Sequence, residues 1–309
     1  MPGFLTHYIG GESALRALDP QISGYVAPNA KLFNLGTQGP DIFFYYIPGF
    51  ITKRIRGVGT QMHDSGLGQY FMYMADLIKD SQSPAQRQII FAYTAGFLAH
   101  YAIDVHTHGY VYASTQADTG MKESSLHRHF ETSIDVLMLD RTHGQKPRDY
   151  KQWQLISPDK ETLRVAAAAM HGAIQAVYGL NIRHSDTRCA MSHMSKLTRC
   201  LQSRSGRRKR WLGRAEDIIV GSRIISALVH MEEVTDGRDY LNLAKAPWHA
   251  PWTPDITREE SFVELFEAAI SEAASMITAL HDCMHNNLPR EELSKIIMNR
   301  SLKTGEHTS

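Results

Sequence analysis

Residues 91–112 read FAYTAGFLAHYAIDVHTHGYVY, and this stretch places His100, Asp104 and His108 four positions apart in an apolar segment. An α-helix turns by roughly 100° per residue, so side chains four positions apart lie on one stripe of its surface. Burying two imidazoles and a carboxylate on one stripe is costly unless they find a partner. A lone histidine on an apolar helix is usually a hydrogen-bonded core residue, but the spaced triplet favours a metal ion. The stretch therefore predicts a helix that carries metal ligands.

A second candidate pair of ligands follows in residues 125–138, which read SLHRHFETSIDVLM. His127 and Glu131 are again four positions apart, and the apolar residues around them have helical spacing. Such a pair alone is weak evidence, because His and Glu at this spacing also form ordinary exposed helix pairs. Nitrogen and carboxylate donors without thiolates suit a catalytic zinc site better than a structural site built on cysteine. Taken with the triplet, the pair predicts a zinc-dependent hydrolase.

The composition is compatible with a large hydrophobic core. Of the 309 residues 43% are hydrophobic, and a formal net charge of +1 gives no overall attraction to nucleic acid or anionic membrane. The three cysteines have spacings unlike a zinc knuckle and are expected to be reduced thiols. The opening MPGFLTHYIGGESAL lacks the basic and apolar regions of a secretory signal, and no apolar run has the length of a membrane span. We therefore expect a cytoplasmic protein without a transmembrane segment.

Helix start signals divide the chain. Ser83 and Pro84 provide an N-cap and a first-turn proline, so the helix with the triplet is expected to begin there. Residues 21–60 contain many prolines and glycines and are expected to be rich in loops. Near the C-terminus, Thr257 and Glu260 predict a capping box for a long amphipathic helix.

No stretch shows a convincing alternating strand pattern, so the chain is predicted to be all-α and to form a single domain over residues 1–309. One basic run stands out at residues 203–214, which read SRSGRRKRWLGR. Such a run is usually a solvated loop, and the alternative is a phosphate-binding patch that uses Arg207, Arg208 and Arg210.

Several ordered motifs resemble those of the bacterial zinc-dependent phospholipase C family: THYIGG, LGTQGPDIFFYY, a downstream MH, AHYAIDVHTH and HRHFE. The later segments DYLNLAKAPWHAPW and ESFVELFEAA look like cytoplasmic members of that family. More distantly, the ligand pattern is similar to that of the single-strand-specific zinc nucleases. The resemblance implies a multi-helical fold with a cleft that holds three zinc ions.

The resemblance also implies a set of ligands. The first zinc would be held by Asp41, His63, His100 and Asp104, and the second by His108, His127 and Glu131. The third would use His7, the bridging Asp104, and the N-terminal amine and carbonyl. In the family this terminal residue is typically a tryptophan freed by cleavage of a leader, whereas this chain begins MPGFLTH. We hypothesise that removal of Met1 exposes the nitrogen and carbonyl of Pro2 as ligands.

The function implied is hydrolysis of a phospholipid or a similar phosphate ester by hydroxide that two or three Zn²⁺ ions activate. Asp41 is the candidate to orient or deprotonate the attacking water. A first alternative is a nuclease in which Arg207, Arg208 and Arg210 bind phosphates while Trp211 or Tyr45 stacks on a base. A second alternative is a helical scaffold that keeps a metal cluster without catalysis. The oligomeric state and the exact ester stay open.

Overall fold

The computed structural model describes residues 3–46, 53–116, 123–201 and 233–308. These residues form helices and no β-strand, apart from two isolated bridges, Trp248 with Arg258 and Arg300 with His307. The described helices are α1 (Phe4–Ala17), α2 (Pro20–Val26), η1 (Ala27–Asn29), α3 (Ala30–Gly36), η2 (Gly39–Phe43), α4 (Lys53–Asp64), α5 (Leu67–Asp80), α6 (Pro84–Thr115), α7 (Glu123–His143), α8 (Gln152–Leu155), α9 (Lys160–Tyr178), α10 (His184–Leu201), α12 (Phe262–Met284) and α13 (Arg290–Ile297). The predicted all-α class is confirmed.

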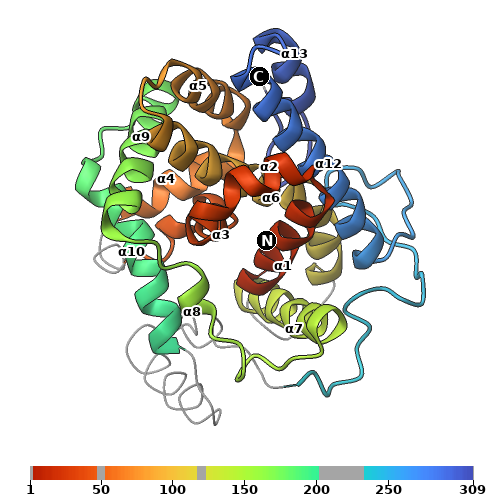
Figure 1. Cartoon of the computed structure of the whole chain (residues 1–309). Coiled ribbons are helices and arrows are strands. Elements are labelled where there is room, and N and C mark those ends of the chain that lie inside the picture. The colour runs from red at the N-terminus through yellow and green to blue at the C-terminus, as the bar shows by residue number, and fades with distance from the viewer. Residues whose placement is uncertain (1–2, 47–52, 117–122, 202–232, 309) are drawn as a thin grey trace.

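Helix α6 runs through the middle of the molecule, and the other helices surround it (Figure 1). It begins as the sequence predicts, since the Ser83 side chain accepts a hydrogen bond from the backbone N–H of Gln86 and Pro84 occupies the first turn. All of its residues from 90 to 104 are buried. A helix whose faces are largely apolar all round is stable only when other helices cover it. The stripe of α6 that carries His100, Asp104 and His108 is therefore also inside the protein.

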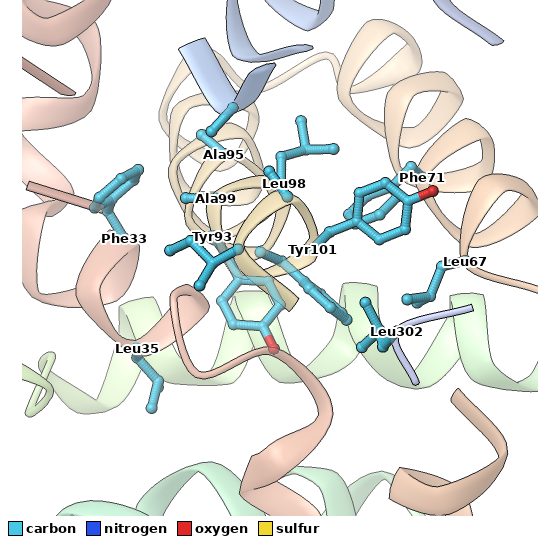
Figure 2. Close-up of a cluster of buried hydrophobic side chains, with 14 of the residues drawn as sticks. Phe33, Leu35, Leu67, Phe71, Tyr93, Ala95, Leu98, Ala99, Tyr101 and Leu302 are labelled. Carbon is cyan, nitrogen blue, oxygen red and sulfur yellow. The ribbon is translucent and has the colours of Figure 1, made fainter. Parts of the chain in front are cut away.

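The packing around α6 combines small and large side chains. Figure 2 shows the labelled side chains of this region: Phe33 and Leu35 from α3, Leu67 and Phe71 from α5, Tyr93, Ala95, Leu98, Ala99 and Tyr101 from α6, and Leu302 near the C-terminus. Ala95 and Ala99 add little bulk to α6, and both are fully buried. Interdigitation of this kind holds α6 at a defined position, because a packed interior leaves few voids.

The prediction that residues 21–60 are rich in loops is wrong. The described part of this region is mostly helical and contains α2, η1, α3, η2 and α4. Its described prolines, Pro28 and Pro40, mark helix starts, as does Pro20 just before the region, because each lies in the first positions of a helical segment. Proline is tolerated there since its missing N–H would have no intrahelical acceptor. Counting prolines as loop formers ignored this position dependence.

The capping box of α12 lies four residues later than predicted. Ser261 is the N-cap and Glu264 completes the box, with both reciprocal hydrogen bonds present. Thr257 cannot start the helix because the adjacent Arg258 pairs with Trp248, with N–O distances of 2.9 and 2.7 Å. The helix therefore begins only after this bridge. Two consecutive S/T-x-x-E patterns occur in the sequence, at residues 257–260 and 261–264, and a tertiary contact selects the second.

None of the described helices combines the length and the apolar character that crossing a bilayer requires. The basic run at residues 203–214 lies outside the described residues.

Candidate metal centre

The polar stripe of α6 faces ligands that other helices supply. Nε2 of His100 lies 3.1 Å from Oδ2 of Asp104 one turn further along α6. Nε2 of His7, on α1, lies 3.3 Å from the other carboxylate oxygen of Asp104. The rings of His7 and His100 are stacked with their centroids 4.1 Å apart. The carboxylate of Asp104 therefore has an imidazole on each of its two oxygens.

Asp41 and His63 close the same group from the side of η2 and α4. Oδ1 of Asp41 lies 3.3 Å from Nε2 of His63. Two sets of ligand atoms here are close enough to hold an ion: His7 with Asp41 and His100, and His63 with His100 and Asp104. The resemblance placed His7 with Asp104, and the structure puts His7 next to Asp41 and His100 as well. Five predicted ligands thus form one continuous cluster in which His100 belongs to both sets.

A second cluster contains His108, His127 and Glu131, whose ligand atoms also lie close enough to hold an ion. Nε2 of His127 is 2.9 Å from Oε1 of Glu131, one turn apart on α7. His108 comes from α6, one turn beyond Asp104. The α6 stripe therefore serves both clusters. All eight side chains that the sequence nominated as metal ligands belong to one of the two.

The residues fit a bound cation, because several of their polar atoms are buried without a hydrogen-bond partner. These atoms are both ring nitrogens of His7, Nε2 of His100, Oδ1 of Asp41 and both carboxylate oxygens of Asp104. The N–O distances of 3.1–3.3 Å do not have hydrogen-bond geometry. A fully buried carboxylate with no hydrogen bond is costly, and a metal ion would supply the missing partner.

The electrostatics of the two clusters follow from burial and from neighbouring charges. Burial alone would raise the pKa of Asp104, but His100, His108 and His7 around it hold that pKa well below its usual value. Burial lowers the pKa of His7 and lowers that of His108 further. Burial would raise the pKa of Glu131, yet interactions that include His127 lower it to about 2. Anionic carboxylates and neutral imidazoles are the protonation states that bind zinc.

The motif LGTQGPD brings two groups to this centre. Gly39 has a φ of +46°, and a Cβ at this position would lie 2.3 Å from the His100 ring. Glycine therefore allows η2 to pass directly over His100 and to place Asp41 beside it. The carbonyl of Thr37, in the same motif, contacts Nδ1 of His100 at 3.1 Å. The motif thus positions one candidate ligand and orients another.

Four candidate imidazoles share an arrangement in which Nδ1 contacts an oxygen and Nε2 points to the cluster. The oxygens belong to Gly59 for His63 at 2.6 Å, Thr37 for His100 at 3.1 Å, Leu302 for His108, and the Thr115 hydroxyl for His127 at 3.3 Å. A carbonyl can only accept, so it fixes the proton on Nδ1 and leaves the Nε2 lone pair for a metal. These orienting groups were not predicted from the sequence, because three of them are backbone carbonyls.

Asp135 is a further residue that the sequence interpretation missed. It is fully buried on α7, and its carboxylate accepts hydrogen bonds from the backbone N–H groups of Leu5 and Thr6 at 3.0 and 2.8 Å. It caps α1, the helix that carries His7, from a position one turn beyond Glu131. The signal was present, because His127, Glu131 and Asp135 repeat at every fourth position as the α6 triplet does.

Two arginines lie on the helices that carry His63 and His127. Arg56 lies seven positions before His63 on α4, which places both on one face of that helix. Arg128 directly follows His127 on α7, and its Nε is buried without a hydrogen-bond partner. Burial and the charge of Arg128 lower the pKa of Arg56. Partly buried arginines are suited to bind an anion.

Tyr45 follows Asp41 by four residues. Burial raises the pKa of its hydroxyl, and the charges of Asp41, Asp135 and Glu131 add to the effect. A neutral tyrosine hydroxyl can donate a hydrogen bond to an oxygen of a bound ester.

A protein-family model described as zinc dependent phospholipase C matches residues 6–180. The chain belongs to this family. The matched region contains every candidate side-chain ligand from His7 to Glu131, and the resemblance drawn from the sequence motifs is confirmed. Zinc is thus the metal that the two clusters are suited to hold, and the family is one of phospholipase C-type hydrolases. Searches among curated proteins and solved structures found no match.

Other predicted participants of this phospholipase C-like site lie outside the described residues. These are Pro2, the expected terminal ligand, and the basic-run residues Arg207, Arg208, Arg210 and Trp211.

Proposed function

We propose that this protein is a zinc-dependent phosphodiesterase that cleaves a phospholipid or a similar phosphate ester in the manner of a phospholipase C. The observation that supports this most directly is Asp104, whose fully buried carboxylate has no hydrogen bond and lies between the imidazoles of His7 and His100. A side chain in this position is suited to bridge two metal ions. A structural zinc site would not need several metal positions side by side.

His7, Asp41, His63, His100 and Asp104 would hold zinc in the first cluster, and His108, His127 and Glu131 would hold it in the second. When bound, clustered zinc ions lower the pKa of a coordinated water and neutralise charge on phosphoryl oxygens. The protein then has mainly to position the ester, since phosphoryl transfer depends on placement and charge stabilisation.

Asp41 is the proposed catalytic residue beside the metals. Its side chain remains 12% exposed whereas that of Asp104 is fully buried, so of these two carboxylates only Asp41 can reach both the first cluster and solvent. A carboxylate in this place can orient the attacking water and accept a proton from it. Arg128 is a candidate to bind an anionic substrate, because it follows His127 on α7 and its buried Nε has no hydrogen-bond partner.

The test is elemental analysis of the untagged protein, together with hydrolysis of bis(p-nitrophenyl) phosphate before and after chelation. Two or three zinc ions per chain with turnover that a chelator abolishes and zinc restores would support the proposal. Zinc without turnover on phosphodiesters would identify a scaffold instead. Comparing phospholipid vesicles with single-stranded DNA as substrates separates a phospholipase from a nuclease, and preferential cleavage of DNA would contradict the substrate assigned here.

A further inference from the structure

Residues 299–308, which we name the C-terminal hook, reach the metal centre from outside the region that the family model matches. The backbone N–H of Leu302 donates to the carbonyl of His63 at 3.0 Å, and the hydroxyl of Ser301 donates to the same carbonyl at 3.1 Å. The carbonyl of Leu302 accepts a hydrogen bond from Nδ1 of His108. One peptide segment thus contacts a candidate ligand of each cluster.

We propose that the C-terminal hook is a positioning element of the metal centre, so that zinc binding and closure of the hook stabilise each other. The proposal rests on the metal binding proposed above. It assigns the hook a function that extends the metal-binding unit to the far end of the chain, some 170 residues after the last candidate ligand, Glu131.

The contact with His108 is the step that links the hook to a metal. Because the Leu302 carbonyl can only accept, it holds the proton on Nδ1 and turns the Nε2 lone pair toward His127 and Glu131. Without this carbonyl, the buried ring would lose its orientation and the Nδ1–H would lose its acceptor. Loss of such an orienting contact typically weakens metal binding by about 10- to 100-fold.

The hook is held in place by contacts that do not involve the candidate ligands. Arg300 forms an ion pair with Glu272 on α12, and its backbone N–H donates to the Tyr101 hydroxyl on α6 at 3.0 Å. Glu272 also binds His106 of α6, with an N–O distance of 2.5 Å. Arg300 is therefore the main ionic anchor of the hook, two residues before the carbonyl that contacts His108.

The shape of the hook is equally specific. It folds back on itself through hydrogen bonds from Ser301 N–H to the Glu306 carbonyl at 2.9 Å and from Thr308 N–H to the Asn299 carbonyl at 2.8 Å. The side chain of Leu302 is fully buried beside α6 (Figure 2). Gly305 has a φ of +73°, and a Cβ there would lie 2.7 Å from the carbonyl oxygen of Val105. A glycine is needed for the hook to lie against α6 at this point.

Two substitutions open the hook from different sides without touching a ligand. Arg300→Gln removes the ion pair with Glu272 that anchors the hook. Gly305→Ala displaces the returning segment of the hook from Val105. The matched control is Arg290→Gln, which breaks the ion pair between Arg290 on α13 and Asp76 on α5, with an N–O distance of 2.8 Å. This control removes the same charge from the same end of the chain, but at a site that contacts no candidate ligand.

The first measurement is the zinc affinity of each full-length variant, by competition with a chromogenic chelator, together with its denaturation midpoint. We expect Arg300→Gln and Gly305→Ala to weaken at least one zinc by about 10-fold or more, and Arg290→Gln to retain wild-type affinity. If the hook variants lose stability but bind zinc as the control does, the hook merely packs against the protein and the proposal is overturned.

The second measurement tests the reverse direction, because a coupling between two sites must be reciprocal. Hydrogen exchange of the peptide that contains residues 298–308 is followed by mass spectrometry in zinc-loaded and chelated wild-type protein. We expect zinc to slow exchange in this peptide, and equal rates in both states would contradict the proposal. A wild-type protein that binds no zinc would refute the proposed metal centre itself, whereas zinc-loaded active protein with an indifferent hook would refute only this inference.

Discussion

Oδ1 of Asp135 on α7 accepts a hydrogen bond from the backbone N–H of Thr6 on α1, with an N–O distance of 2.8 Å. The Thr6 hydroxyl donates to the same oxygen at 2.6 Å. This contact joins the helix that carries His127 and Glu131 to the helix that carries His7. It occurs where a helix N-terminus has free N–H groups, and a carboxylate is favourable there because of the helix dipole.

Replacing Asp135 by alanine is therefore expected to destabilise the protein and to displace His7. Loss of an N-cap typically costs about 1 kcal/mol, and the buried N–H groups left without an acceptor add about 1–3 kcal/mol. Denaturant titration and zinc analysis measure the two effects. Asp159→Ala is the control, because Asp159 caps α9 in the same way at an exposed position. It should lower stability only, and an equal zinc loss in both variants would refute the link to His7.

Asp104→Asn is expected to lose zinc and phosphodiester turnover together. An amide has one carbonyl oxygen and no charge, so it cannot replace a carboxylate whose two oxygens lie against His7 and His100. Turnover should fall by about 100-fold or more, since metals supply several kcal/mol of transition-state stabilisation. His171→Ala provides the comparison, because among the described residues His171 contacts the Ile182 carbonyl at 2.9 Å and the His184 ring and belongs to neither cluster. Full activity of Asp104→Asn would contradict the mechanism.

Thr115→Val is expected to weaken zinc binding at the second cluster by about 10-fold, because it removes the hydroxyl that contacts Nδ1 of His127. Valine nearly matches threonine in shape, so the fold should persist. Thr142→Val is the matched control, because Thr142 contacts Nδ1 of its neighbour His143 in the same way at an exposed position on α7. Isothermal titration of zinc into metal-free protein distinguishes the two, and an unchanged zinc affinity in Thr115→Val would show that the hydroxyl does not orient His127.

Arg128→Gln is expected to raise KM for an anionic phosphodiester by about 10-fold, with little change in zinc content. A hydrogen bond to a charged group contributes about 1.5–3 kcal/mol, and Arg128 has a buried Nε with no acceptor of its own. Arg141→Gln removes the same charge from an exposed position on α7 and should behave as wild type. Steady-state kinetics on both variants provides the test, and equal KM values would remove Arg128 from substrate binding.

The stability contributed by Glu272 is expected to depend on pH. Burial would raise the pKa of Glu272, but His106 and Arg300 lower it below its usual value. A carboxylate with a lowered folded-state pKa stabilises the protein fully above its unfolded pKa of about 4.3, and this contribution is lost as pH falls through the lower folded value. The difference in unfolding free energy between wild type and Glu272→Gln should therefore be constant above about pH 5.5 and shrink in more acidic solution. A difference that grows on acidification would contradict this sign.

The sequence alone predicted the helical class, the start of α6 at Ser83 and the spaced ligands on α6 and α7. These features are local, because helical periodicity and an N-cap are determined by residues within a few turns of each other. The role of Asp41, the last residue of LGTQGPD, as a metal ligand was recognised only through resemblance. Its physical reason, the passage of Gly39 over His100, requires two segments that are 60 residues apart to be in contact.

The failures have the same origin. Residues 21–60 were expected to be rich in loops, but burial against α6 stabilises short helices that start at prolines. The N-cap of α12 was assigned to Thr257, and the pairing of Arg258 with Trp248 moves it to Ser261. In each case a long-range contact overrides a local signal.

The chain's residue types and their spacing determined which side chains are suited to bind zinc. Only the tertiary structure decided how these side chains divide into clusters and which groups orient them. The orienting groups are largely backbone carbonyls, such as those of Thr37 and Leu302, and every residue has a carbonyl. Their selection depends on where the chain passes in space, and this depends on the packing of the whole core around α6 rather than on any local pattern.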